Sequence, residues 1–170
     1  MVELKTIKKE NVASALELAK KYRLLGEPDE AESICRDILE VEDDNQDTLI
    51  TLLLALTDKF PSSGLNPVFD QAKEIIERLA EPYCKAYYLG IVYERRAKYH
   101  LKQGGPGCGP ASYQWFARAL DAYNEALESC DPDNQDAVLR WNSCVRIINN
   151  NPHVKADDET PSDLLLDAYD

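Results

Sequence analysis

The segment from residue 12 to residue 45 constrains the fold of this chain more than any other stretch. It reads VASALELAKKYRLLGEPDEAESICRDILEVEDDN. Apolar residues recur in its first half with the period of an α-helix, and a second run with the same period follows the break at residues 26–29. The small residues Ala19 and Ala31 fall where two helix backbones would approach closely. The segment therefore predicts an antiparallel helical hairpin.

Further helices follow from the same periodicity. They are expected over residues 46–59, 69–79, 82–103, 111–130 and 135–149. Stretches rich in Gly and Pro, residues 60–67 and 104–110, are expected as loops between them. The tetrapeptide DNQD occurs twice, at 44–47 and 133–136, each time where an Asn or Asp would cap the next helix. We expect an all-α fold of about seven helices in antiparallel hairpins, the third hairpin being enlarged.

The first hairpin resembles a tetratricopeptide repeat (TPR), whose period is about 34 residues. The matching positions are Tyr22, Gly26, Ala31 and Leu39. Two positions depart from the family pattern, since Ala15 replaces a large aromatic residue and Asp43 replaces a closing proline. The resemblance spans about residues 11–149. It implies a short right-handed superhelix of hairpins.

Two regions are predicted on this basis. A TPR-like helical repeat domain covers residues 1–152, and an acidic tail covers residues 153–170. The tail contains Leu164, Leu165 and Leu166 flanked by Asp, a pattern that suits a short amphipathic helix. Two interpretations stay open for it: the tail covers the last apolar helix, or it lies in the groove of the array.

Composition points to a globular chain of the cytoplasm. The hydrophobic fraction is 44%. No apolar run approaches the roughly 18 residues that a membrane span needs, and the charged start MVELKTIKKEN does not suit a signal peptide. Five cysteines, an odd number, have spacings that fit no disulfide framework, so reduced thiols are expected. We therefore predict a cytoplasmic protein without a membrane partner.

The charge balance argues against nucleic acid as a partner. The chain has 31 acidic and 19 basic residues, a formal net charge of −12, and no concentrated basic stripe. Such a chain repels phosphate backbones. Two interpretations of the acidity stay open, namely solubility alone and attraction of a basic partner.

The sequence contains no pattern typical of a catalytic centre, a metal site or a cofactor site. Its two histidines, His100 and His153, have no Ser or Cys at a catalytic spacing. The Gly-rich stretch 104–110 lacks the Lys-Ser/Thr ending of a phosphate-binding loop, and Cys108 is expected there as an exposed thiol. No Cys-x-x-Cys pair occurs. We therefore expect no catalytic residue, no metal and no cofactor.

The TPR resemblance implies a concave groove lined by the first helix of each hairpin. Carrying the family's spacing onto this chain predicts as peptide-binding residues Leu16, Lys20, Arg23, Ile50, Leu54, Tyr87, Tyr88, Ile91 and Arg95. Glu94 falls on the same helix face. For each of these residues the alternative is packing against a neighbouring helix. The predicted function is a non-enzymatic adaptor that binds a protein or peptide segment.

Two other classes of function are kept as alternatives. One is an enzyme or small-ligand sensor with a cleft between helices 82–103 and 111–130, near Tyr83, Tyr99, His100 and Trp115. A deep enclosed pocket that holds His100 beside a carboxylate would favour this alternative, and a solvent-exposed His100 would count against it. The other is a self-assembling structural unit, in which exposed apolar residues form a homo-oligomer.

Overall fold

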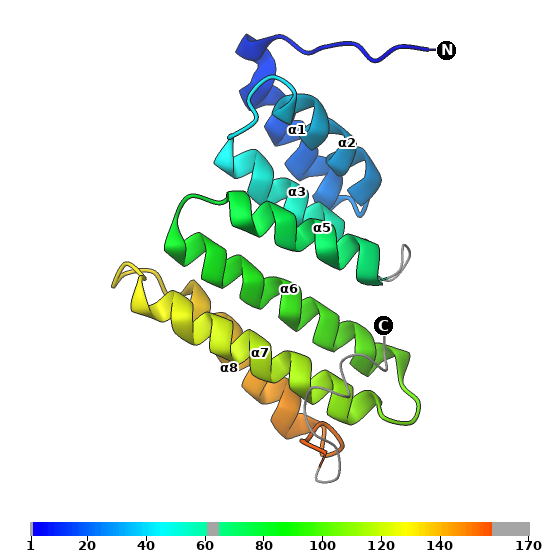
Figure 1. Ribbon diagram of the computed structural model, residues 1–170, viewed down its shortest axis with the longest axis vertical. Helices are drawn as coiled ribbons and strands as arrows, with labels where there is room; N and C mark the ends of the chain where they lie inside the picture. Colours follow the sequence, from blue (N-terminus) through cyan, green and yellow to red (C-terminus); the bar gives the residue numbers. More distant parts are fainter. Residues whose placement is uncertain (1, 61–64, 158–170) are drawn as a thin grey trace. The chain divides into compact units, whose positions relative to one another are not determined.

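The computed structural model describes residues 2–60 and 65–157 of the chain (Figure 1). Within these ranges it contains seven α-helices, one short 3-10 helix and no β-strand, which confirms the predicted all-α class. The chain divides into two compact units, Met1–Leu79 and Ala80–Asp170, which we call unit 1 and unit 2. The predicted superhelix and the predicted domain boundary at residue 152 stay predictions.

Unit 1 begins with the predicted hairpin. A 3-10 turn, η1 (Lys9–Asn11), leads into α1 (Val12–Leu24), which packs against α2 (Pro28–Leu39). Ala19 and Ala31 are both completely buried, as their small size predicts. Gly26 joins the two helices with φ +79°, a left-handed conformation that side chains disfavour.

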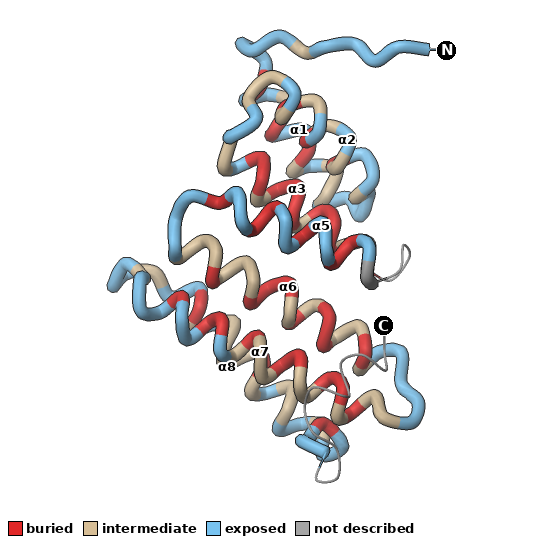
Figure 2. The backbone as a smooth tube through the Cα atoms, in the orientation of Figure 1, coloured by how far each residue is buried: buried red, intermediate tan, exposed pale blue. Residues whose placement is uncertain are grey.

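The next two helices of unit 1 are α3 (Gln46–Asp58) and α5 (Leu65–Arg78). Because α3 packs against α2, α5 and α1, both of its faces are covered, as its apolar sequence predicts (Figure 2). The predicted apolar face of α5 is buried and consists of Phe69, Ala72, Ile75, Ile76 and Leu79.

The predicted loop 60–67 is wrong at its end. Helix α5 begins at Leu65, so Pro67 lies in its first turn, where a missing N–H leaves no hydrogen bond unmade. Residues 61–64 of that loop lie outside the described residues.

Unit 2 contains the predicted enlarged hairpin. Helix α6 (Pro82–Gln103) has 22 residues, and α7 (Cys108–Glu128) has 21. The loop between them is shorter than predicted, because α7 begins at Cys108. The expectation of an exposed thiol is therefore wrong, since Cys108 is half-buried in the first turn of α7. Gly109 is buried against the backbone carbonyl of His153, at a position where a Cβ atom would collide with it.

The last described helix, α8 (Asp136–Asn150), packs on α7. Its fully buried residues are Ala137 and Cys144. Apolar periodicity favours a different stripe, which is only half-buried and consists of Val138, Trp141, Val145 and Ile148. The guanidinium of Arg140, outside that stripe, reaches across to Glu94 of α6.

Three other expectations concern the apolar residues and the tail. Leu127, expected in the core, is 37% exposed. In the part of the chain that the structure describes, no helix is both long enough and apolar enough to cross a bilayer. Most of the tail, residues 158–170, lies outside the described residues, so both interpretations of it stay predictions.

Candidate protein-binding surfaces

The predicted groove residues of unit 1 have different surroundings. Leu16 is only 7% exposed, because it packs in a core cluster with Val12 and Ile38, and it offers almost no surface to a ligand. Lys20 donates to the carboxylate of Glu17 at 2.8 Å, and this hydrogen bond raises the pKa of Lys20.

Arg23, in contrast, connects two helices. Its Nε donates to Oδ2 of Asp58 at 2.7 Å and so joins the ends of α1 and α3. Ile50 and Leu54 are half-buried on α3. Peptide contact by these residues stays a prediction.

The predicted residues of unit 2 lie mostly within its packing. The Tyr87 ring stacks on Tyr83 with centroids 5.5 Å apart and meets Tyr88 edge-on at 5.1 Å. Tyr83 and Tyr87 also cover a buried alanine cluster, Ala86, Ala126 and Ala137. Burial raises the pKa of Tyr87 and raises that of Tyr83 to about 12. Packing is thus the main role of this aromatic group.

The other two predicted residues of α6 differ in burial. Ile91 is buried, whereas Arg95 is half-buried. Peptide contact by the predicted residues of unit 2 also stays a prediction.

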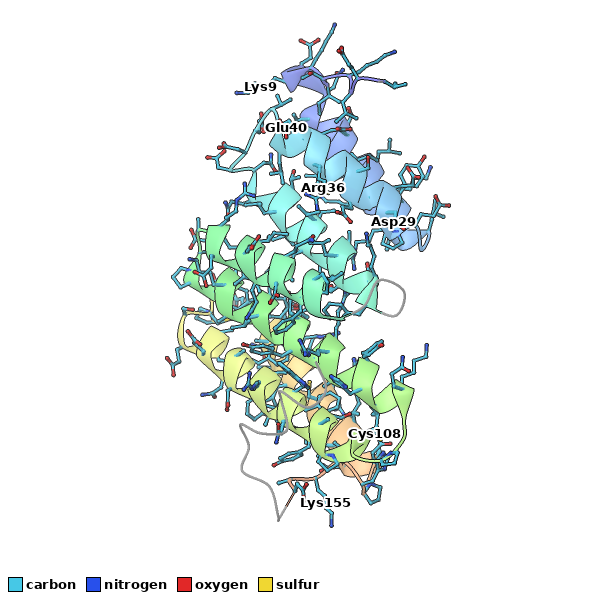
Figure 3. The ribbon with its side chains drawn as sticks, turned by 45° about the vertical axis from the view of Figure 1, so that its right-hand side comes forward. Lys9, Asp29, Arg36, Glu40, Cys108 and Lys155 are labelled. Atoms are coloured by element: carbon cyan, nitrogen blue, oxygen red, sulfur yellow. The ribbon has the colours of Figure 1, made fainter. Side chains whose placement is uncertain are left out.

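A groove of about 490 Å³ lies in unit 1, between α2 and α5 and over α3. Its floor is apolar and consists of Leu39, Leu52, Leu56 and Ile75. Its rim is polar and consists of Arg36, Glu40, Gln71, Glu74 and Arg78. Figure 3 shows Arg36 and Glu40 along α2. We call this site the α2–α5 groove.

The rim of the α2–α5 groove contains two carboxylates that are available to a ligand. Glu40 and Glu74 have no ion pair or side-chain hydrogen bond with any described residue. Arg36 is paired with Glu32, with an Nη2–Oε1 distance of 2.6 Å. Arg78 donates to the backbone carbonyl of Asp43, a neutral acceptor, so it keeps its positive charge at one end of the rim.

The sequence analysis did not find this groove, because it placed binding on a different face of α3. The floor residue Leu52 follows the predicted residue Ile50 by two positions, and Leu56 follows Leu54 by two positions. Two positions correspond to about 200° around a helix, so the groove lies on the opposite side of α3 from the predicted contacts. A usable signal was the polar stripe Gln71, Glu74 and Arg78 beside Ile75, which recurs at helical spacing on α5.

Glu94, predicted to face a groove, is completely buried in unit 2. Its Oε2 accepts from Arg140 Nε at 3.0 Å and from Tyr123 Oη at 2.6 Å, and its Oε1 accepts from Arg140 Nη2 at 2.8 Å and from Lys98. Burial, followed by the charge of Glu94, raises the pKa of Tyr123. With both oxygens engaged, this carboxylate links α6, α7 and α8 and is poorly placed for proton transfer.

Of the four residues of the alternative ligand cleft, His100 and Trp115 are buried, whereas Tyr83 and Tyr99 are half-buried. His100 is 7% exposed and lies edge-on to Tyr99, with ring centroids 5.8 Å apart. The Trp115 ring lies under two guanidinium groups, with Arg96 at 4.2 Å and Arg118 at 5.0 Å from its centroid. The exposed His100 that would count against a ligand cleft is thus not observed, and that alternative stays a prediction.

The cysteines and acidic residues show no sign of metal chemistry in the described ranges. No three His, Cys, Asp or Glu side chains gather there as metal ligands would. Cys35 and Cys144 are fully buried, and burial raises the pKa of each thiol to about 12. Both therefore stay protonated at neutral pH and behave as small apolar residues.

Comparison of this chain with protein-family models, with curated proteins and with solved structures finds no match. The TPR resemblance therefore stays a prediction, and function is inferred from the surfaces of the two units.

Proposed function

We propose that this chain is a non-enzymatic interaction module whose α2–α5 groove binds a protein segment with apolar residues next to Lys or Arg. The observation that supports this function is the apolar floor between two carboxylates, Glu40 and Glu74, that lack a partner among the described residues. In this proposal the earlier prediction of a protein or peptide partner is kept, but the binding face changes.

The apolar contacts supply affinity. Of the floor residues, Leu39 is half-buried and offers the most surface to a ligand, whereas Leu52, Leu56 and Ile75 are buried and form a rigid base beneath it. Full burial of one Leu or Val side chain contributes about 1.5–3 kcal/mol. Association also costs translational and side-chain entropy, so two such anchors give modest affinity.

The carboxylates supply orientation and selectivity. A Lys or Arg of the ligand would pair with Glu40 or Glu74 at the exposed rim, where salt screens the attraction. The net charge of −12 adds a longer-range attraction for basic segments. The same charge disfavours nucleic acid as the ligand.

Selection of random peptides displayed on phage, with the full chain as target, tests this function. We expect enriched peptides to combine Leu, Ile or Val with Lys or Arg, and to bind more weakly as salt concentration rises. Reversing the rim charges with Glu40→Lys and Glu74→Lys should weaken binding at least about tenfold.

The matched control reverses Glu30 and Asp70, which are exposed on the same two helices but lie outside the groove lining. Glu30→Lys with Asp70→Lys should leave binding nearly unchanged. Enriched peptides without basic residues, or equal losses in the two double variants, would contradict the proposed site.

A further inference from the structure

Exposed apolar side chains are frequent near the start of the chain. Seven large hydrophobic side chains are exposed in the described part of the chain, and five of them lie in the first 25 residues: Val2 (99%), Leu4 (93%), Leu18 (45%), Leu24 (86%) and Leu25 (61%). Of these five, Leu18 lines a hollow on the surface of unit 1. We call residues 2–8 together with the outer face of α1 the N-terminal edge.

The N-terminal edge has a hollow of about 680 Å³ where the segment before η1 passes α1. The hollow is lined by Thr6, Ile7, Lys8, Asn11, Ser14, Ala15 and Leu18. Ile7 and Ala15 also pack against the core cluster of unit 1, which holds one side of the hollow in place. Figure 1 shows the segment before η1 extended beyond α1.

The outer face of α1 continues this surface. Ser14, Leu18, Lys21 and Leu25 follow one another at the three- and four-residue spacing of a single helix face. Among the described helices, α1 packs against η1, α2 and α3. The exposed side of α1 therefore presents Leu18 next to the charge of Lys21.

The charge of the N-terminal edge is opposite to that of the chain. Residues 2–8 contain Lys5 and Lys8 against Glu3, and Lys21 lies on the outer face of α1, although the whole chain has a net charge of −12. Lys5, Lys9 and Lys21 form no ion pair with any described residue. Two copies of this edge would repel each other, so its complement is an acidic apolar segment.

The chain itself contains one such segment. Residues 158–170 read DETPSDLLLDAYD, with five acidic residues, no basic residue, and Leu164, Leu165 and Leu166 in succession. We propose that the N-terminal edge binds residues 158–170 of a second copy, with the leucines on the hollow and Leu18, and with the carboxylates near Lys5 and Lys21. Edge and segment are different surfaces, so this contact joins copies head to tail.

Sedimentation of the full chain over a range of concentrations tests this contact. We expect the average mass to rise above the 19.2 kDa of the monomer as concentration increases, and to fall as salt is added. Lys5→Glu with Lys21→Glu on the edge should weaken self-association at least about tenfold, and so should Asp163→Lys with Asp167→Lys in the segment.

A charge swap makes the test specific. Combining all four substitutions in one chain, or mixing the two double variants, should restore association, since opposite charges again face each other. The control, Lys102→Glu with Lys155→Glu, reverses two exposed lysines of unit 2 that form no ion pair with described residues, and it should not change association.

Three results would overturn the proposal. The first is a full chain that stays monomeric at every concentration. A monomeric full chain would overturn the proposal even if its edge bound an added peptide with the sequence of residues 158–170. The second is association that neither double variant weakens. The third is failure of the charge swap to restore it. The α2–α5 groove contributes no residue to this contact, so peptide selection on the groove can succeed or fail independently.

Discussion

Each of the two units contains one carboxylate that ties helices together, and the two differ mainly in their access to water. Glu32 of unit 1 pairs with Arg36, one turn later on α2, and with Lys59, which follows α3. Glu94 of unit 2 pairs with Lys98, one turn later on α6, and with Arg140 of α8. The two arrangements thus have the same plan, namely one local cation and one distant cation.

The two carboxylates differ in how strongly water and salt screen their ion pairs. The Glu32 side chain is 14% exposed, and its partner Arg36 is 56% exposed, so water and salt screen the pair. Burial favours the neutral form of Glu32, but the hydrogen bonds from Lys59 and Arg36 outweigh burial and lower its pKa.

Glu94, in contrast, has no solvent contact. Its desolvation is offset by hydrogen bonds from Arg140, Tyr123 and Lys98. Burial works against the charge of Arg140, yet Glu94 raises the pKa of its guanidinium. We infer from this comparison that burial sets how much a carboxylate contributes to the free energy of unfolding, even where the pattern of partners is the same.

The largest effect is expected from Glu94→Ala. This change leaves the charge of Arg140 and the hydroxyl of Tyr123 without their partner in a buried site, which should cost about 3 kcal/mol of unfolding free energy. Urea unfolding followed by tryptophan emission measures it, because both tryptophans, Trp115 and Trp141, lie in unit 2.

Glu125→Ala provides the control for Glu94→Ala. Glu125 is exposed on α7 and forms no ion pair with described residues, so its loss should change stability by less than about 0.5 kcal/mol. Equal effects of the two substitutions would contradict the role of burial.

An intermediate effect is expected from Gly90→Ala. A Cβ atom at Gly90 would lie 2.5 Å from the Tyr123 ring, which is fully buried and anchored through its hydroxyl to Glu94. The overlap should destabilise unit 2 by about 1–3 kcal/mol, partly offset by the roughly 1 kcal/mol that Ala gains over Gly within a helix. Thermal unfolding of the variant, followed by tryptophan emission, measures the balance. A melting temperature equal to or above that of the wild type would show that Tyr123 is free to move.

The smallest effect is expected from Glu32→Gln. The cost at neutral pH should be about 0.2–1 kcal/mol, because the pair is partly exposed. Since the folded state lowers the pKa of Glu32 below 4.5, the contribution is present above that pH and is lost as the pH falls further.

Urea unfolding of the wild type and of Glu32→Gln at neutral and acidic pH, followed by circular dichroism, checks this pH dependence. The two stabilities should converge in acid. Glu30→Gln changes an exposed position on the same helix, so its stability should stay close to that of the wild type at both pH values. A difference that persists at low pH would assign the effect of Glu32→Gln to packing.

The repeated tetrapeptide DNQD shows that the same local sequence does not always make the same capping contacts. Asn45 caps α3 as predicted, since its side-chain oxygen accepts from Thr48 N at 3.0 Å and from Thr48 Oγ1 at 2.7 Å. The second copy behaves differently, because Asn134 accepts from Asp136 N at 2.9 Å, one residue ahead of the position that would cap α8. The hydroxyl of Thr48, which follows the first copy, has no counterpart in Ala137, which follows the second, and the same four residues make different contacts.

The sequence by itself determined the all-α class, the first hairpin and the long hairpin of unit 2. These features depend on helical periodicity and on Gly and Pro, which act within a few residues.

Only the tertiary structure decided which face of each helix is buried and which is open. The leucines of α3 surround the helix, so periodicity could not assign Leu52 and Leu56 to the α2–α5 groove. The partnership of Glu94 with Arg140 spans 46 residues, and Arg140 lies outside the apolar stripe of α8. Contacts of this kind depend on how helices meet in space, which no short stretch of sequence contains.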